Sequence, residues 1–145
     1  MVSRNSLGTD QLFSILIEYS ASEIKFQECV RLVLRYHLTK VPLYFIRDHK
    51  GNTPKHTAVC HGCWEVFQTL IDAGASIRSK GAKGRTVLHV TAERGRGEMV
   101  RGLVGMGVEV LARDRQEKTA GDVAREMGHV GAVGFLEGVV RGRGR

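Results

Sequence analysis

The 145 residues suit one domain or a short array of repeats, and 42% of them are hydrophobic, enough to bury a core. With 26% charged residues, the composition is not that of a disordered chain. The formal net charge of +7 comes from 22 basic and 15 acidic residues that are interspersed along the chain. Dense nucleic-acid binders usually segregate their charge more sharply, so nucleic acid is not the favoured partner.

No segment reaches the roughly 18 apolar residues that a membrane-spanning helix requires. The apolar run at residues 12–17 is also too short for a secretory signal and is closed by Glu18. Three unevenly spaced cysteines do not form a disulfide framework. We therefore expect an intracellular protein, cytoplasmic or nuclear, with no membrane contact.

The first 47 residues carry helix signals but no repeat motif. Thr9 or Asp10 is placed to cap a short helix that ends near Tyr19. Ser20 and Glu23 then have the spacing of a capping box, ahead of apolar residues at helical spacing. The pattern predicts a divergent helical cap over residues 1–47. One more repeat, diverged beyond its motif, remains an equal alternative for residues 10–47.

A fixed spacing of 33 residues organises the rest of the chain. It relates Gly51 to Gly84, Thr53 to Thr86, His56 to His89, Gly62 to Gly95 and Gly74 to Gly107, and a weaker third copy continues with Thr119, Gly128 and Leu136. Such a period indicates a repeat protein. The boundaries predicted from it are 48–80, 81–113 and 114–140, followed by a basic disordered tail at 141–145.

The first two repeats have the same local signals. A glycine turn precedes a threonine that can cap a helix, and in the first repeat Pro54 occupies the first helical position. A second glycine ends this short helix, and a third ends the helix that follows. The predicted antiparallel pairs are 54–61 with 64–73, 87–94 with 97–106, and 120–127 with 130–138. A single pair cannot bury its apolar face alone and has to stack on its neighbours.

These strings resemble the ankyrin repeat. The residues that match the family pattern are Asp48, Gly51, Thr53, Pro54, His56, Ala58, Gly62, Glu65, Val66, Leu70, Ile71, Gly74 and Ala75; Gly84, Thr86, Leu88, His89, Ala92, Gly95, Glu98, Val100, Leu103 and Gly107; and Asp114, Thr119, Ala124, Gly128, His129 and Leu136. The resemblance spans about residues 48–140. It implies an all-α ankyrin-repeat solenoid that binds proteins without catalysis.

The chain departs from the family pattern at several positions. Lys55 stands where the family places a buried leucine, so its charge has to reach solvent or destabilise the fold. Val87 replaces the proline, and the third repeat has Gly121 for the leucine and Asp122 for the histidine. Glycines inside the second helices each cost roughly 0.5–1 kcal/mol relative to alanine. They are Gly102, Gly105, Gly131 and Gly134. The pattern is that of a degenerate array.

The cluster of His56, Cys60, His61 and Cys63 contains zinc-ligand types. A single Cys-x-x-Cys without a second pair is a weak signal, and the repeat already accounts for His56, so we expect no metal at this cluster. Residues 81–86 lack the strand and the Gly-Lys-Ser/Thr order of a phosphate-binding loop. No catalytic arrangement stands out either. The sequence predicts no enzyme, no cofactor and no small-molecule substrate.

In the family, the turn tips and the exposed side of the first helices form the binding surface. By register this surface is His49, Lys50, Asn52, Cys60, His61, Ala82, Lys83, Arg85, Glu93, Arg94, Arg115, Gln116, Lys118, Glu126 and Met127. The basic excess is largest in residues 81–113, with six basic and three acidic side chains. We therefore expect an acidic protein partner. Two alternatives remain: a fragment of a longer array without independent activity, and weak nucleic-acid binding by the basic edge.

Overall fold

A computed structural model of the chain describes residue 47 and residues 50–72 and 74–143. The helices expected before residue 47, and His49, lie outside these residues. Within them the fold is all-helical, with six α-helices and no strand. The chain divides into two compact units, residues 1–76 and 77–145.

The first unit contains α3 (Pro54–Cys60) and α4 (Trp64–Asp72), which pack against each other. Helix α3 begins directly after Thr53, with Pro54 at a position where no amide donor is needed. Gly62 has a φ of 76° and turns the chain between the helices. The buried apolar side chains of this unit are Ala58, Val59, Val66, Phe67 and Leu70.

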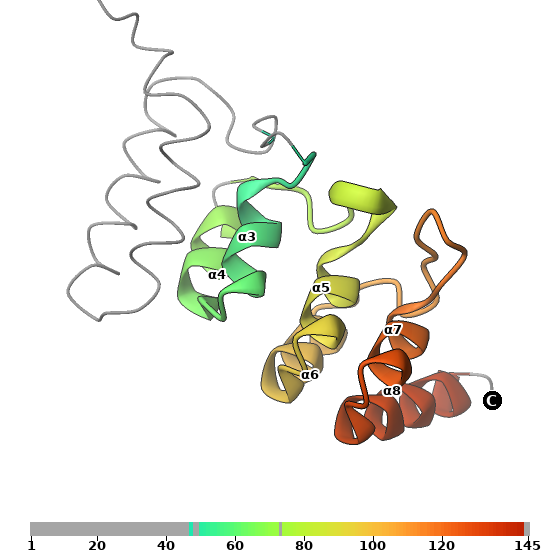
Figure 1. Ribbon diagram of the computed structural model, residues 1–145. Coiled ribbons are helices and arrows are strands. Elements are labelled where there is room, and N and C mark those ends of the chain that lie inside the picture. The colour runs from blue at the N-terminus through green and yellow to red at the C-terminus, as the bar shows by residue number, and fades with distance from the viewer. Residues whose placement is uncertain (1–46, 48–49, 73, 144–145) are drawn as a thin grey trace, which may run out of the picture. The chain divides into compact units, whose positions relative to one another are not determined.

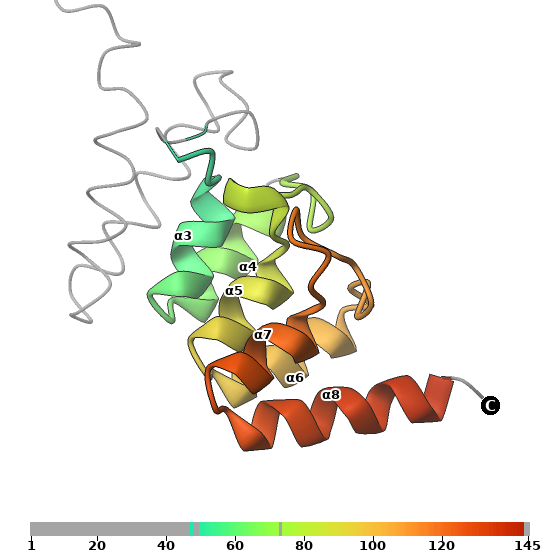
Figure 2. The ribbon, with the colours of Figure 1, turned by 45° about the vertical axis from the view of Figure 1, so that its right-hand side comes forward.

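The second unit contains α5 (Val87–Glu93), α6 (Gly97–Gly105), α7 (Ala120–Glu126) and α8 (Val130–Arg143), with a 3-10 turn at Ala82–Gly84. The two pairs stack with α5 beside α7 and α6 beside α8 (Figures 1 and 2). The buried apolar residues between them are Val87, Leu88, Ala92, Met99, Val100, Leu103, Val108, Val110, Ala120, Val123, Ala124, Ala132 and Leu136.

The period of 33 predicted from the sequence is present in the helices. First helices begin at Pro54, Val87 and Ala120, and second helices at Trp64, Gly97 and Val130. The predicted helix pairs are confirmed, and the bounds differ by one residue except at the end of α8. The helices include Gly102 and Gly105 in α6 and Gly131 and Gly134 in α8, as predicted, and the longer α8 also includes Gly138 and Gly142.

The predicted disordered tail is corrected in part, because α8 continues to Arg143. Helix α6 ends where Gly107 takes a φ of 83°, whereas the equivalent residue, Val140, lies inside α8. A β-branched residue strongly disfavours that left-handed conformation, so the stop signal is missing. Arg141 and Glu137, one turn apart, form an ion pair of 3.4 Å that supports the extension.

Lys55 is buried, with 2% of its surface exposed. Its Nζ donates a hydrogen bond to the carbonyl oxygen of Ser76. Burial, and then the positive charge of Arg47, lower the pKa of the Lys55 amine to about 8. The charge therefore does not reach solvent, and the fold carries the cost of holding an amine inside the first unit.

Candidate interaction surface

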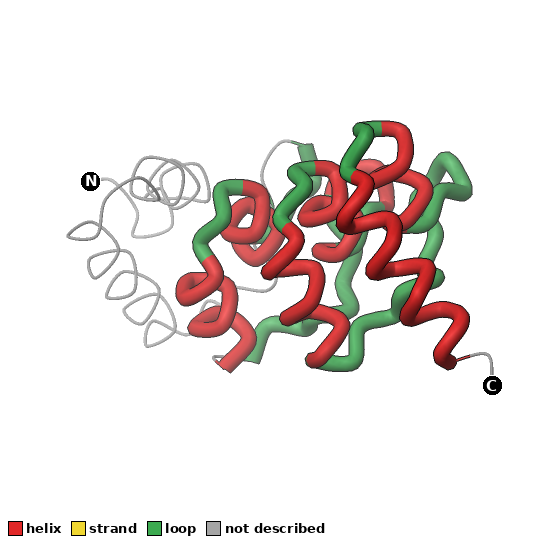
Figure 3. Tube along the Cα trace, turned by 90° about the horizontal axis from the view of Figure 1, so that it is seen from below, coloured by secondary structure: helices red, strands yellow, loops and turns green. Residues whose placement is uncertain are grey.

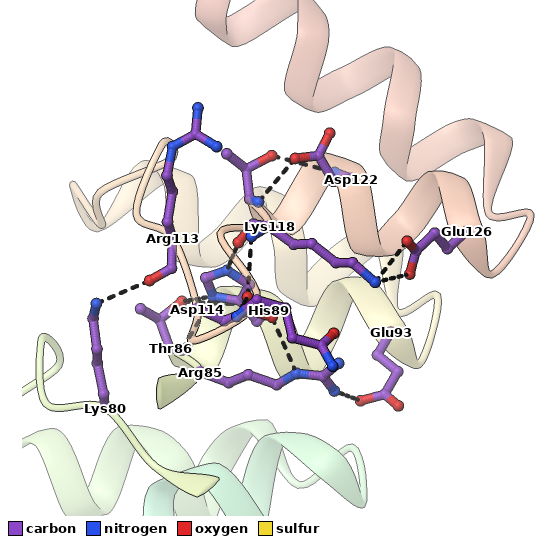
Figure 4. Close-up of polar contacts among 12 residues, drawn as sticks. Lys80, Arg85, Thr86, His89, Glu93, Arg113, Asp114, Lys118, Asp122 and Glu126 are labelled. Atoms are coloured by element: carbon purple, nitrogen blue, oxygen red, sulfur yellow. Dashed lines mark hydrogen bonds and ion pairs between the residues drawn. The ribbon is translucent and has the colours of Figure 1, made fainter. Parts of the chain in front are cut away.

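Two loops of the second unit lie side by side. The first leads into α5 over residues 77–86, and the second joins α6 to α7 over residues 106–119 (loops green in Figure 3). The Nζ of Lys80 donates to the carbonyl oxygen of Arg113 at 3.0 Å (Figure 4), and the amide of Arg115 donates to the carbonyl oxygen of Lys83 at 3.0 Å. One side-chain and one backbone hydrogen bond therefore join the two loops.

His89 ties the start of α5 to the second loop. Its Nδ1 accepts from the amide of Thr86 at 3.1 Å, while the Thr86 hydroxyl accepts from the amide of His89 at 3.3 Å. Because Nδ1 is an acceptor, Nε2 carries the hydrogen and donates to the carbonyl oxygen of Lys118 at 2.8 Å. Burial lowers the pKa of His89, which keeps the imidazole neutral. The histidine holds the loop in place and is not available to a ligand.

Asp114 organises the second loop from inside. Its Oδ1 accepts hydrogen bonds from the amides of Gln116, at 2.8 Å, and Lys118, at 3.0 Å. Burial alone would raise the pKa of this carboxyl group, but these two hydrogen bonds, with His89 and Arg85, hold it below its usual value. Asp114 is therefore an ionised, buried residue that shapes the loop.

Two ion pairs lie along the first helices, 33 residues apart. Arg85 contacts Glu93 at 2.6 Å, and its Nε lies 3.6 Å from Oδ2 of Asp114. Lys118 contacts Glu126 at 2.7 Å (Figure 4). Four of the residues predicted from register to bind a partner are thus paired with each other within their own repeats.

The other predicted residues of this unit include three exposed cations. The side chains of Lys83, Arg94 and Arg115 are exposed and make no ion pair with another residue that the structure describes. Gln116 is also exposed, Met127 is 54% exposed, and Ala82 is half-buried. The loops bring Lys83 and Arg115 together, while Arg94 and Met127 follow the far ends of α5 and α7.

The remaining predicted residues belong to the first unit. Lys50 is exposed, and Asn52, Cys60 and His61 are half-buried. They share this unit with Cys63, whose thiol, like that of Cys60, forms no disulfide. No group of three potential metal ligands occurs in the part of the chain that the structure describes.

One basic side chain of the second loop, Arg113, was not predicted from the repeat register. Arg113 is exposed, and its guanidinium donates to the carbonyl oxygen of Glu117 at 2.6 Å. Because a carbonyl oxygen carries no net charge, this hydrogen bond does not neutralise the guanidinium of Arg113. The available signal was the spacing of 33 between Lys80 and Arg113, two basic residues that the structure then places in contact.

Comparison with known proteins agrees with the period. The family model described as Ankyrin repeat matches residues 50–82 and 83–115. Each match starts two residues after the boundary predicted from the glycine turns. A search of curated proteins found no match. Among the described helices, none has the length and apolar character required to cross a membrane.

Proposed function

Because the chain carries ankyrin repeats, units that generally mediate protein–protein interactions, we propose that it is a non-catalytic interaction module that binds an acidic protein segment. Binding occurs at the loop edge, which we define as Lys83, Arg113 and Arg115. This proposed site is smaller than the binding surface predicted from the repeat register, because it includes only the loop tips of the second unit.

The observation that carries this proposal is the difference between paired and unpaired cations. Arg85 and Lys118 form ion pairs with carboxylates on the helix faces, whereas the three loop-edge cations form no ion pair with a carboxylate among the described residues. An acidic segment that approached the helix faces would compete with Glu93 and Glu126 for their cations. At the loop edge it meets exposed positive charge, and the exposed acidic side chains of the same loop are Glu109 and Glu117.

Electrostatic attraction of this kind acts mainly on the rate of association and weakens as salt screens it. Since exposed charges interact over about 8 Å at physiological ionic strength, the three cations act on a short segment of the partner. The proposal therefore predicts faster association with acidic than with neutral peptides, and a larger difference at low salt.

The test uses a fluorescein-labelled, glutamate-rich peptide and a glutamine-rich peptide of equal length, with anisotropy as the readout. Arg115→Glu should lower the affinity for the acidic peptide at least about tenfold at low salt, because it replaces attraction by repulsion. The matched control is Arg94→Glu, the same change at an exposed arginine at the far end of α5. It should change the affinity less than about twofold, since it lies outside the loop edge.

Two results would overturn the proposal. One is equal binding of the acidic and the glutamine-rich peptide by the unmodified protein. The other is tighter binding of an oligothymidylate than of the acidic peptide, with a steep loss in salt, which would assign the edge to nucleic acid. Circular dichroism of both variants checks that the helices are retained.

A further inference from the structure

We infer that Lys83 and Arg115 form a single clamp for two neighbouring carboxylates of the partner, an inference that rests on the proposed function and specifies the anchoring pair. The occupant is an extended acidic segment with acidic residues at positions i and i+2. The two cations are expected to act together, so that each depends on the other for its effect.

The first support is the close approach of the two loops. The amide of Arg115 donates to the carbonyl oxygen of Lys83 at 3.0 Å, which places the two residues next to each other from separate repeats. A Cβ added at Gly84 would lie 3.0 Å from Cγ of Arg115 and 3.3 Å from its amide nitrogen. Glycine at position 84 thus makes room for the start of the Arg115 side chain beside Lys83.

The second support is the cost of this arrangement to the fold. Lys83 has a φ of 59°, the left-handed conformation that costs a side chain about 1 kcal/mol and that glycine adopts freely. Two neighbouring positive charges repel each other, and no carboxylate among the described residues neutralises either one. Neither the positive φ of Lys83 nor the pair of like charges stabilises the fold. A backbone outlier at an exposed like-charge pair is typical of a binding site.

The chemistry of the two side chains defines the occupant. Arginine binds a carboxylate through two parallel hydrogen bonds, and lysine acts as a compact point charge. In an extended segment, residues i and i+2 project from the same face about 6–7 Å apart. Two acidic residues at that spacing present one carboxylate to each cation, whereas a single carboxylate satisfies one cation and leaves the other without a partner.

A double-mutant cycle tests whether the two cations act together. Its four proteins are the unmodified chain, Lys83→Gln, Arg115→Gln and the double variant, titrated with a labelled Gly-Ser peptide that contains one Glu-x-Glu. Each single change should weaken binding about five- to tenfold, and the double change should weaken it at least about threefold less than the product of the two. Arg94→Gln is the control, and it should combine multiplicatively with Arg115→Gln.

Two further probes define the occupant. A peptide with one glutamate should bind the unmodified protein at least about threefold more weakly than the Glu-x-Glu peptide, and it should show no coupling between the two positions. A peptide with one phosphoserine should bind no tighter than the Glu-x-Glu peptide. Tighter binding of the phosphoserine peptide would assign the clamp to a phosphate and overturn the carboxylate assignment.

The outcomes separate this inference from the proposed function. If the unmodified protein binds no acidic peptide, the proposed function fails. If it binds and the two losses simply multiply, the clamp is wrong and the loop edge acts as diffuse charge. Lys83→Gly provides an independent check, because it should raise the melting temperature while it weakens peptide binding. A purely structural role for Lys83 predicts instead that binding is unchanged.

Discussion

The second helix pair (α5 and α6) and the third (α7 and α8) have the same backbone arrangement. They differ in the side chains on the C-terminal side of the stack, where a following repeat would pack. In α5, Leu88, His89 and Ala92 are fully buried. The equivalent residues of α7, 33 positions later, are Gly121, Asp122 and Arg125, of which Arg125 is exposed. Helix α7 packs on α5 and buries these three residues of α5. In the part of the chain that the structure describes, no further repeat packs on the equivalent positions of α7.

Charge replaces apolar contact on the third pair. Arg125 bonds to Asp122 at 3.2 Å and to Glu137 of α8 at 2.6 Å, and Glu137 also contacts Arg141 at 3.4 Å. Exposed ion pairs contribute only about 0–1 kcal/mol each, so this network contributes less than buried packing would. The comparison shows that the same repeat geometry can present either a stacking face or a polar, solvent-facing one, depending on three or four side chains.

The comparison is tested most strongly by His89→Ala. The change removes a buried ring and leaves the carbonyl oxygen of Lys118 without its donor, so we expect a loss of about 3 kcal/mol or more in the free energy of unfolding. Asp122→Ala, at the equivalent position, removes the carboxylate that accepts from the Thr119 amide, together with its exposed ion pair to Arg125, and should cost about 1 kcal/mol. Urea unfolding measures both, and equal losses would contradict the distinction between the two faces.

In the first unit, Lys55 occupies the position in the repeat that Leu88 occupies in the second unit. Its folded pKa of about 8 lies below that of an unfolded lysine, so the unfolded chain binds more protons between pH 8 and about 10.5. Stability should therefore rise with pH across that window, by about 3 kcal/mol for the full shift.

Lys55→Leu should be more stable than the unmodified chain at pH 7. Its free energy of unfolding should not show the increase between pH 8 and about 10.5 that comes from deprotonation of Lys55. Urea unfolding of both proteins at several pH values gives the difference curve. A curve that stays flat between pH 8 and 10.5 would show that the lysine retains an ordinary pKa.

A smaller effect is expected at the end of α8. Val140→Gly restores the residue type that stops α6 at Gly107, so the last turn of α8 should open and lose the contact between Arg141 and Glu137. We expect a cost of about 1 kcal/mol and faster amide hydrogen exchange over residues 140–143. Unchanged exchange there would mean that packing, and not the missing glycine, extends the helix.

The smallest effect is a gain. Glu117 has a φ of 62° at the position where the earlier turns have Gly51 and Gly84. Glu117→Gly should relieve the strain and raise the free energy of unfolding by about 0.5–1 kcal/mol. Glu109→Gly, an exposed glutamate without positive φ, is the control and should give no gain. Thermal unfolding measures both variants.

Much of the local structure follows from short-range chemistry. Thr53, Thr86 and Thr119 each precede a helix, and the glycines at 62, 95 and 128 have positive φ between the helices of a pair. These signals act within a few residues, so the sequence alone predicts the helix pairs, their period and the ankyrin resemblance. The greater length of α8 could also have been predicted, because Val140 stands where the preceding repeat has Gly107. The helix pairs predicted from the repeat period placed the end near residue 138 instead.

Short-range sequence signals could not predict which cations are exposed to a partner and which form ion pairs within the fold. Register placed Lys83, Arg85 and Lys118 on one surface as equals, but Arg85 is held by Glu93 of its own repeat and faces Asp114 of the next loop. Lys83 meets Arg115 only because stacking brings two loops into hydrogen-bond contact. Turn and helix signals depend on neighbouring residues and are determined by the sequence, whereas the pairing of charges depends on side chains that only the stacked tertiary structure brings together.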